Sequence, residues 1–236
     1  MAPTVVCSFW VHRPADFPDA ADYIGMLKIL DRSCRAAGMR HVVLTDMASS
    51  RMLPEDMERF ESDLPRNLLQ ATTAAQAEWV REGRYRSDDT VFVGADCVVL
   101  RDFRPSLLPA DLTICTFVHR RLWIMNGFLH IPAASRHKLA PVFDKVAKGT
   151  RALPARTCDD MCSWERVLGP KPRELWGKET RRGLTVRFVP EPIWNERPLS
   201  ADEPYPDAHI LHFRGPAQKP MFFEWVARHR PELVVA

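Results

Sequence analysis

A single carboxylate lies between two apolar runs at residues 90–103, TVFVGADCVVLRDF. The run TVFV leads to Asp96, and a second run, CVVL, follows it directly. Runs rich in β-branched residues predict buried strand segments. A carboxylate buried there costs free energy unless a cation pairs with it. A divalent metal that carries a nucleotide diphosphate is the usual partner at such a position, so Asp96 is a candidate metal ligand.

Strand-like and helix-like patterns alternate through the first half of the chain, and this alternation predicts an α/β fold with a mostly parallel central sheet flanked by helices. At 236 residues the chain fits one domain. Strands are predicted at residues 4–10, 41–44, 90–99, 112–117, 127–131, 186–189 and 209–213, helices at 20–37, 54–60, 68–82, 135–148, 159–168 and 221–229, and a loop at 170–183.

Polar residues stand where three of the predicted strands end. Ser8 to Trp10 close the first strand, Asp46 follows the second, and Asp96 lies in the third. Ligands of parallel sheets bind beyond the carboxyl ends of the strands, which predicts a nucleotide crevice at this edge. The first strand–helix turn has no Gly-rich fingerprint, which argues against a dinucleotide site.

Two motifs carry a resemblance to a known family. The Asp96 stretch resembles the acidic metal motif of GT-A glycosyltransferases, a short Asp-x-Asp flanked by hydrophobic strands, with Gly94 in place of the first Asp. Residues 209–220, HILHFRGPAQKP, resemble the His-x-x-Gly-x-x-Lys-Pro motif of family 8 glycosyltransferases. The resemblance implies that His212 completes the metal site and that Gly215 and Lys219 meet the donor phosphates, with one extra residue before Lys219.

Three weaker motifs follow the family in order and spacing. Asn126-Gly127 resembles the strand start that meets the sugar in these enzymes. The segment 158–161, CDDM, resembles the Gly-Asp-Gln start of an acceptor-side helix, which would place Asp160 at the reactive carbon. Asp159 could share that role or cap the helix. The stretch that ends in Trp194-Asn195 also resembles the family, but we interpret it as a packed turn.

The resemblance runs from residue 4 to about residue 225 and implies a single GT-A-like, Rossmann-related domain. Residues 1–103 would form the nucleotide-binding half and residues 104–236 the acceptor-binding half. The implied activity is sugar transfer from a nucleotide-sugar donor, expected to be a UDP-sugar, to a hydroxyl acceptor. Mn²⁺ or Mg²⁺ would be held by Asp96 and His212. By position, Ser8, Phe9, Trp10 and Asp46 would contact the nucleotide base.

An uneven charge distribution bears on the acceptor. Residues 136–187 hold 13 Lys and Arg against 6 Asp and Glu, although the net charge of the whole chain is only +3. A hydroxymethylated base in DNA, as in phage modification enzymes, is one candidate acceptor, and a glycan or lipid-linked sugar is the other. A solvated basic face would also explain the charge. The DNA candidate predicts base stacking on Trp164, Trp176 or Trp194 and phosphate contacts from Arg136, Lys138, Lys171, Arg173, Arg181 and Arg182.

Location and rival classes complete the predictions. The sequence shows neither a signal peptide nor a membrane span, and cysteines such as Cys7, Cys97 and Cys115 lie in apolar runs, which is typical of reduced thiols in a bacterial or phage-infected cytoplasm. A nucleotidyltransferase would be expected to carry a Gly-rich basic loop, which is absent here. A non-catalytic nucleotide-binding module would explain Gly94.

Overall fold

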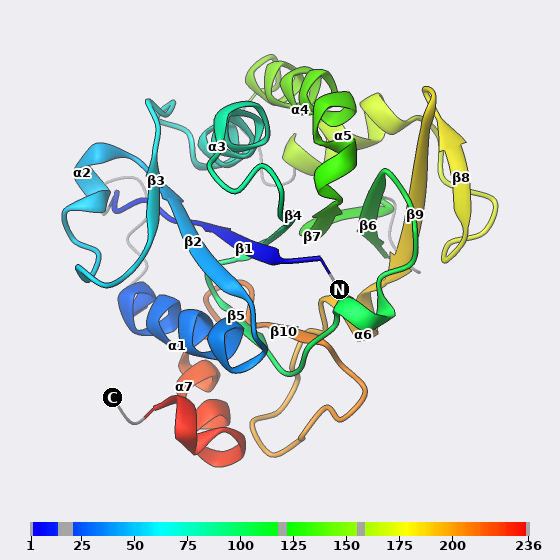
Figure 1. Ribbon diagram of the computed structural model, residues 1–236. Coiled ribbons are helices and arrows are strands. Elements are labelled where there is room, and N and C mark those ends of the chain that lie inside the picture. Colours follow the sequence, from blue (N-terminus) through cyan, green and yellow to red (C-terminus); the bar gives the residue numbers. More distant parts are fainter. Residues whose placement is uncertain (1, 14–20, 118–121, 155–158, 235–236) are drawn as a thin grey trace.

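A twisted eight-stranded sheet runs through the middle of the protein (Figure 1). The computed structural model describes residues 2–13, 21–117, 122–154 and 159–234. The strands of the sheet are β1 (Thr4–Phe9), β2 (Arg40–Thr45), β3 (Arg59–Glu61), β4 (Asp89–Gly94), β6 (Leu112–Thr116), β7 (Ile124–Ile131), β8 (Lys178–Arg181) and β9 (Leu184–Pro190). Their order is β3-β2-β1-β4-β7-β6-β9-β8, and only β7 and β8 run against the others. The predicted α/β class with a mostly parallel sheet is therefore confirmed.

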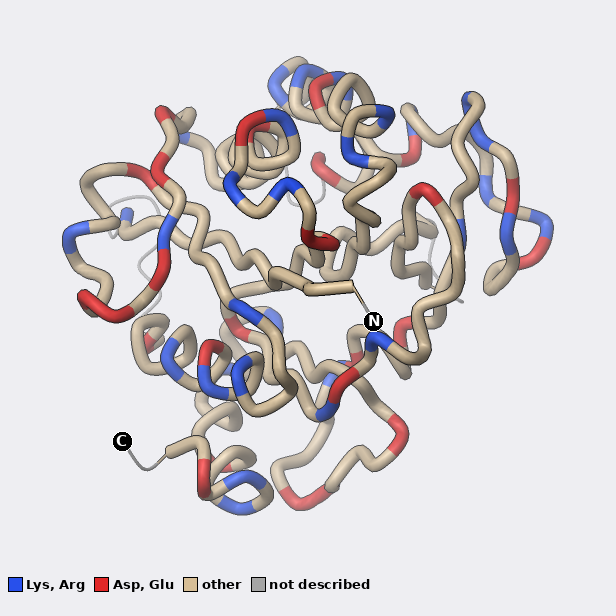
Figure 2. Tube along the Cα trace, viewed as in Figure 1, with Lys and Arg blue, Asp and Glu red and all other residues tan. Residues whose placement is uncertain are grey.

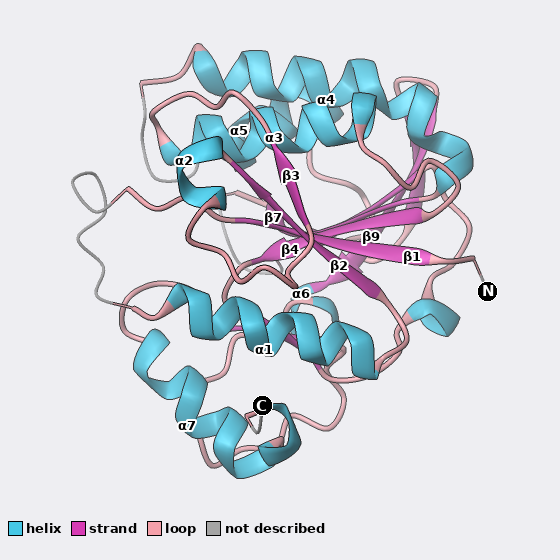
Figure 3. Cartoon of the chain, turned by 60° about the vertical axis from the view of Figure 1, so that its left-hand side comes forward, coloured by secondary structure: helices cyan, strands magenta, loops and turns pink. Residues whose placement is uncertain are grey.

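Helices cover both faces of this sheet. Figure 3 shows α3, α4 and α5 on one face and α1 and α7 on the other. The helices are α1 (Tyr23–Ala36), α2 (Met47–Ser50), α3 (Leu68–Glu82), α4 (Arg136–Arg151), α5 (Asp159–Leu168), α6 (Glu191–Trp194) and α7 (Lys219–His229), with 3₁₀ turns at Arg104–Ser106, Ala133–Ser135 and Pro231–Leu233. Within the described residues, no helix is long and apolar enough to cross a lipid bilayer.

The central strands read as continuous apolar runs because both of their faces are buried. On β1, Val5 and Cys7 belong to the cluster formed with α3, α4 and α5, whereas Val6 belongs to the cluster on the opposite face. Phe143 and Trp164 meet edge-to-face beneath α4 and α5, with ring centroids 4.9 Å apart. This two-sided core holds the carboxyl ends of β1 and β4 in fixed positions.

A second, two-stranded sheet brings the two family motifs together. β5 (Cys97–Val99) pairs antiparallel with β10 (Ile210–His212), and His212 lies opposite Cys97. The pairing continues beyond the strands, because the Phe213 amide donates to the Asp96 carbonyl at 3.0 Å. Two segments more than a hundred residues apart in sequence are thus held side by side at the end of β4.

Three predicted elements differ from the structure. The helix predicted at residues 54–60 is absent: a turn there leads into β3, which pairs with β2 at the edge of the sheet. The Arg59 guanidinium holds this loop by donating to the carbonyls of Ser50 and Pro54. The loop predicted at 170–183 contains β8, because Gly183 (φ +78°) allows a tight turn that pairs β8 with β9. The strand predicted through Asp96 is divided, because a turn at Ala95 and Asp96 separates β4 from β5 and the two strands belong to different sheets. The remaining predicted strands and helices are present, with ends displaced by a few residues.

The basic region of the sequence is only partly a surface feature. Lys and Arg are spread over α4 and the β8–β9 hairpin, interspersed with acidic residues (Figure 2). Arg136, however, is only 7% exposed and donates to the carbonyls of Trp79, Val80 and Gly83 at the end of α3. A predicted phosphate contact by Arg136 is therefore wrong, because its donors already satisfy helix-terminal carbonyls. Lys138 pairs with Asp111 at 3.0 Å.

Reversing the charge of Arg136 should destabilise the fold. Arg136→Glu would leave buried carbonyls without donors and place a carboxylate against them, so we expect a loss of at least about 3 kcal/mol in the free energy of unfolding. Lys145→Glu on the exposed face of α4 is the matched control and should change that free energy by less than about 0.5 kcal/mol. Urea denaturation followed by circular dichroism measures both, and equal stability of the two variants would contradict the assignment.

Candidate active site

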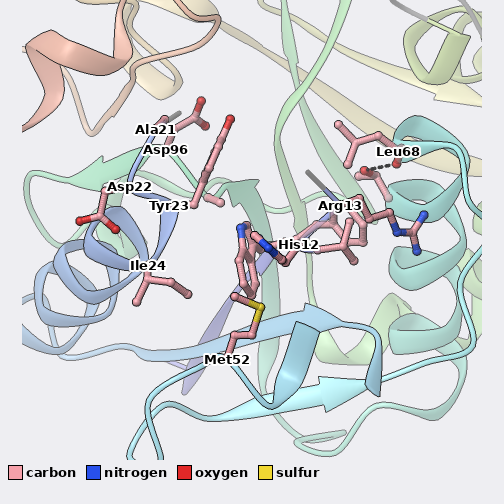
Figure 4. A pocket seen from close by; sticks show the side chains of 14 residues that line it. His12, Arg13, Ala21, Asp22, Tyr23, Ile24, Met52, Leu68 and Asp96 are labelled. Atoms are coloured by element: carbon pink, nitrogen blue, oxygen red, sulfur yellow. Dashed lines mark hydrogen bonds between the residues drawn. The ribbon is translucent and has the colours of Figure 1, made fainter. Parts of the chain in front are cut away.

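A cavity of about 440 Å³ opens at the carboxyl ends of β1 and β4 (Figure 4). The segment after β1 forms one wall, and the start of α1 forms another. In Figure 4, Tyr23 and Asp96 lie together at one side of the cavity, and Arg13 and Leu68 lie at the other. Its lining residues are Phe9, Trp10, Val11, His12, Arg13, Ala21, Asp22, Tyr23, Ile24, Met52, Leu68, Thr72, Ala95 and Asp96. The lining is mainly apolar and aromatic, as is usual in pockets for small organic ligands.

Asp96 is the centre of a compact charged cluster beside this cavity. Its Oδ1 lies 3.1 Å from Nε2 of His212, and its Oδ2 accepts a hydrogen bond from the Lys219 ammonium. Asp96 is 7% exposed and Lys219 is 5% exposed. Burial alone would raise the pKa of Asp96, but His212 and Lys219 hold that pKa well below its usual range. The carboxylate is therefore ionised at neutral pH.

Lys219 reaches Asp96 because the chain turns sharply after β10. Gly215 adopts φ +80°, a conformation that favours glycine, and α7 begins at Lys219. The Lys219 ammonium lies 4.9 Å from the centroid of the Tyr23 ring. Burial would lower the pKa of Lys219, but the Asp96 carboxylate outweighs this effect and raises the pKa. The extra residue of the motif thus does not prevent Lys219 from reaching the cluster.

His212 is oriented by a side chain that the sequence did not mark as functional. Its Nδ1 lies 3.0 Å from Oδ1 of Asn195, which is fully buried. Since an amide oxygen can only accept, Nδ1 donates in this bond, and Nε2 is the ring nitrogen turned toward Asp96. Gly127 makes room for this contact, because a Cβ there would lie 2.5 Å from Nδ2 of Asn195. The packed-turn interpretation of Asn195 missed this role.

The cluster has the geometry of a partial metal site. Two ligands bound at right angles to Mg²⁺ at 2.0–2.1 Å would lie about 3 Å apart, close to the observed separation of Asp96 Oδ1 and His212 Nε2. Gly94 keeps this space open, because a Cβ there would lie 2.6 Å from Asp96 Oδ1 and 2.9 Å from His212 Nε2. Cys97 offers a third nearby ligand atom, but a thiol is a poor match for Mg²⁺ or Mn²⁺. The residues present therefore fit a hard divalent cation completed by ligand oxygens and water.

Asn126 and Asp160, which were predicted from two separate motifs, contact each other. Asn126 Nδ2 donates to Asp160 Oδ2 at 3.0 Å, and Oδ1 of Asn126 is buried without a hydrogen-bond partner among the described residues. Burial raises the pKa of Asp160, an effect that the bond from Asn126 partly offsets. Asp159 is also buried, and its carbonyl accepts from Ser163 Oγ at 2.8 Å. Cys158 lies outside the described residues.

Of the four residues predicted to contact the nucleotide base, Ser8 and Asp46 do not line the cavity. The Ser8 hydroxyl is fully buried and lies 2.9 Å from Nε2 of His41, so it is used inside the sheet. Asp46 caps α2 by accepting from the Ser49 amide and pairs with Arg13 at 3.0 Å. Arg13 itself lines the cavity, and Asp46 orients it. Sequence analysis missed Arg13, although its position after the first strand was a usable signal.

Comparisons with known proteins identify the fold. No family model and no curated protein matches this chain. Among solved structures, a glycosyltransferase involved in glycosylation of the major capsid of PBCV-1 aligns with a TM-score of 0.59 at 11% identity, over 92% of this chain and 97% of that one. The galactosyltransferase LgtC, in complex with donor and acceptor sugar analogs, aligns with a TM-score of 0.54 at 13% identity, over 96% of each chain.

A third structure, the bifunctional glycosyltransferase WbbM in its apo form, aligns with a TM-score of 0.56 at 13% identity. The alignment covers 98% of this chain and 51% of WbbM, so the chain spans about half of that protein. Together these likenesses show that the chain has the fold of GT-A-like glycosyltransferases, which confirms the family resemblance at the level of fold.

Restoring the missing acid of the motif should damage the site. In Gly94→Asp the new Cβ would collide with Asp96 Oδ1 and His212 Nε2, so we expect Mn²⁺ binding at least about tenfold weaker than in the wild type. Gly94→Ala should show the same loss without the added charge. Isothermal titration with Mn²⁺ and a nucleoside diphosphate measures the effect. Gly149→Ala on α4 is the control, because its methyl would lie 3.3 Å from Ser163 Oγ, which must move by a few tenths of an ångström, and does not meet Asp96 or His212. Tighter Mn²⁺ binding by Gly94→Asp would contradict this reading of Gly94.

Proposed function

We propose that this protein is a metal-dependent glycosyltransferase that moves a sugar from a nucleotide-sugar donor to a hydroxyl acceptor. One observation carries the proposal: Asp96, His212 and Lys219 converge beside a largely apolar cavity at the carboxyl edge of the sheet. That edge is where open α/β sheets bind their ligands. The three similar structures are those of glycosyltransferases, which supports the same class of reaction.

The donor would lie with its base and ribose in the cavity and its diphosphate at the Asp96 cluster. Phe9, Trp10 and Tyr23 offer aromatic surfaces to a base, and a uracil nucleotide is the donor we favour. All the cavity residues fall between Phe9 and Asp96, which supports residues 1–103 as the nucleotide-binding half and 104–236 as the acceptor half. Gly215, in the turn before Lys219, would allow the diphosphate to approach the backbone closely.

Asp96 and His212 would hold Mn²⁺ or Mg²⁺, with Asn195 fixing the imidazole. When bound, the metal supplies a Lewis acid that offsets negative charge on the leaving diphosphate. Lys219 adds a fixed positive charge beside the same leaving group. Because Lys219 already neutralises Asp96, a divalent cation alone would leave a buried net positive charge. A nucleoside diphosphate removes that excess, so metal and nucleotide should bind together.

Asn126 and Asp160 would face the transferred sugar. The unpartnered Oδ1 of Asn126 can accept a sugar hydroxyl, and the ionised carboxylate of Asp160 can accept the proton of the acceptor hydroxyl. Asp159, next to it at the start of α5, is the second candidate acid. In a retaining reaction the departing phosphate would instead take the acceptor proton, and Asp160 would stabilise positive charge on the sugar.

Of the two acceptor classes, a saccharide has more support than a base in DNA. Trp164 and Trp194 are 0% and 6% exposed, so neither can stack on a displaced base, and only Trp176 is open to solvent. Arg136 also serves the fold, as described above. DNA stays a second candidate because exposed cations remain on α4 and the β8–β9 hairpin (Figure 2).

A reducing cytoplasm is the compartment that we propose. Cys7, Cys34, Cys97 and Cys115 are buried and unpaired in the described part of the chain. Buried free thiols of this kind are typical of proteins that stay in a reducing environment.

A thermal-shift experiment tests the central claim. UDP with Mn²⁺ at about 100 times Kd should stabilise the protein by about 2.7 kcal/mol, a rise of roughly 5–10 °C in Tm, while either one alone should give a much smaller shift. Asp96→Ala should abolish the joint effect, because it removes the carboxylate of the metal pair. His212→Ala should reduce it, with partial recovery at higher Mn²⁺ concentration.

Lys219→Met tests, in the same assay, the effect of the Lys219 ammonium apart from that of the metal. Without the competing ammonium, Mn²⁺ alone should bind more tightly than in the wild type, whereas UDP should bind more weakly. Arg228→Met, which removes an exposed cation from the same helix, is the control and should change neither. A nucleotide shift that is independent of metal in the wild type would refute metal dependence. A metal-dependent shift with no sugar transfer to any acceptor would favour the non-catalytic module.

The pH dependence of transfer tests Asp160. Burial raises the pKa of its carboxyl, so the acidic limb of kcat/KM should lie above the usual aspartate pKa of about 3.9. Asn126→Ala removes a hydrogen bond that lowers this pKa, so the limb should move to higher pH. Asp160→Asn should reduce kcat by about 10²–10⁴-fold while UDP binding persists. An unmoved acidic limb in Asn126→Ala would show that Asp160 is not the titrating group.

A further inference from the structure

Trp176 is the one exposed tryptophan among the seven in this protein. It is 57% exposed, whereas the other six are at most 6% exposed. An aromatic ring of this size in solvent loses the apolar burial that the other tryptophans gain, and tryptophan is enriched at binding interfaces because its ring offers a large apolar surface. The ring lies in the segment between α5 and β8, which is far in sequence from every residue of the nucleotide cavity.

The backbone on both sides of Trp176 is fixed to the sheet. The carbonyl of Leu175 accepts from Thr116 Oγ1 at 3.0 Å, and the carbonyl of Gly177 accepts from the Phe188 amide at 2.9 Å. Both partners belong to strands of the central sheet, β6 and β9. The ring is therefore presented from an anchored segment, and binding a ligand against it costs little ordering of the chain.

The hydrogen bond between Leu175 and Thr116 lies at the same edge of the sheet as the proposed sugar site. Thr116 is the last residue of β6 and pairs with Ile124, the first residue of β7. From there Asn126 is one strand spacing of about 5 Å and two residues of about 3.3 Å each away. A short acceptor chain is therefore long enough to lie on Trp176 and to place its reacting hydroxyl near Asn126 and Asp160.

A basic groove of about 520 Å³ adjoins this segment. Lys171, Arg173 and Lys178 line it with exposed side chains, and Glu174 lines it with an exposed acid. Glu179, also in the lining, is paired with Arg181 at 2.5 Å. The exposed charges of the groove therefore sum to a net positive value. Figure 2 shows basic and acidic residues alternating along the β8–β9 hairpin.

We propose that Trp176 and this groove form the docking subsite for an acidic saccharide acceptor, one that carries uronate groups. The proposal rests on the glycosyltransferase function and names the class of its acceptor. The flat apolar ring fits the C–H face of a pyranose, and Lys171, Arg173 and Lys178 fit its carboxylates. A single exposed ring with an acid among the cations suits a nucleic acid less well, because nucleic-acid grooves use successive rings and uniformly positive charge.

Intrinsic fluorescence tests this subsite selectively, because acrylamide quenches exposed tryptophan and Trp176 is the exposed one. An oligogalacturonate should shield Trp176 from acrylamide and bind more weakly as salt is raised. Neutral maltotetraose and a single-stranded oligonucleotide should each bind at least about tenfold more weakly. Trp176→Ala should weaken oligogalacturonate binding about tenfold, measured by titration calorimetry, and Trp176→Phe should restore part of it.

Two controls separate this proposal from the function it rests on. Leu108→Ala removes an exposed side chain at the opposite end of the sheet, beside Ala2 and Thr4, and should leave saccharide binding unchanged. UDP binding with Mn²⁺ should be the same in Trp176→Ala as in the wild type. If the wild type does not bind UDP with Mn²⁺, the proposed function is contradicted and the subsite is not. Equal affinity for acidic and neutral saccharides, shielding by the oligonucleotide alone, or no shielding by any of the three would overturn the subsite.

Discussion

The site depends on one buried charge, the carboxylate of Asp96. A lone carboxylate at 7% exposure would be strongly destabilising, and here His212 and Lys219 both approach it. Those two partners come from the far end of the chain, so the charge can be tolerated only when β10 and the start of α7 are in place. Folding of the C-terminal segment and assembly of the charged cluster are thus a single requirement.

Glycine has a specific use around this charge. Gly94 and Gly127 are positions where a methyl group would touch Asp96, His212 or Asn195, so both are needed for close approach and not for flexibility. Gly215 is different: its surroundings are open, and it is needed for its positive φ. The departure from the Asp-x-Asp motif at Gly94 therefore has a local cause, since the space of the first acid is taken by the two side chains that would bind the metal.

The cluster and the Asn126–Asp160 pair lie on two sides of one connected network. Asn126 precedes Gly127, Gly127 gives room to Asn195, and Asn195 holds His212. A change in the orientation of β7 would therefore reach both the proposed metal ligands, Asp96 and His212, and the proposed catalytic acid, Asp160. This network therefore joins residues from the first and second parts of the chain, although the described residues that line the cavity all lie between Phe9 and Asp96.

The sequence by itself determined the class of fold and the main strands, because β-branched runs and helical spacing are local properties. These local patterns alone were enough to predict β1, α3 and α5. It also marked Asp96, which stands between two apolar runs, and the resemblance to a known motif marked His212 and Lys219. Only the tertiary structure decided which of these meet. Ser8 and Asp46 stand at strand ends as the others do, yet hydrogen bonds to His41, Ser49 and Arg13 direct them elsewhere. Asn195 and Trp176 acquired their places through long-range packing, which short-range patterns do not encode.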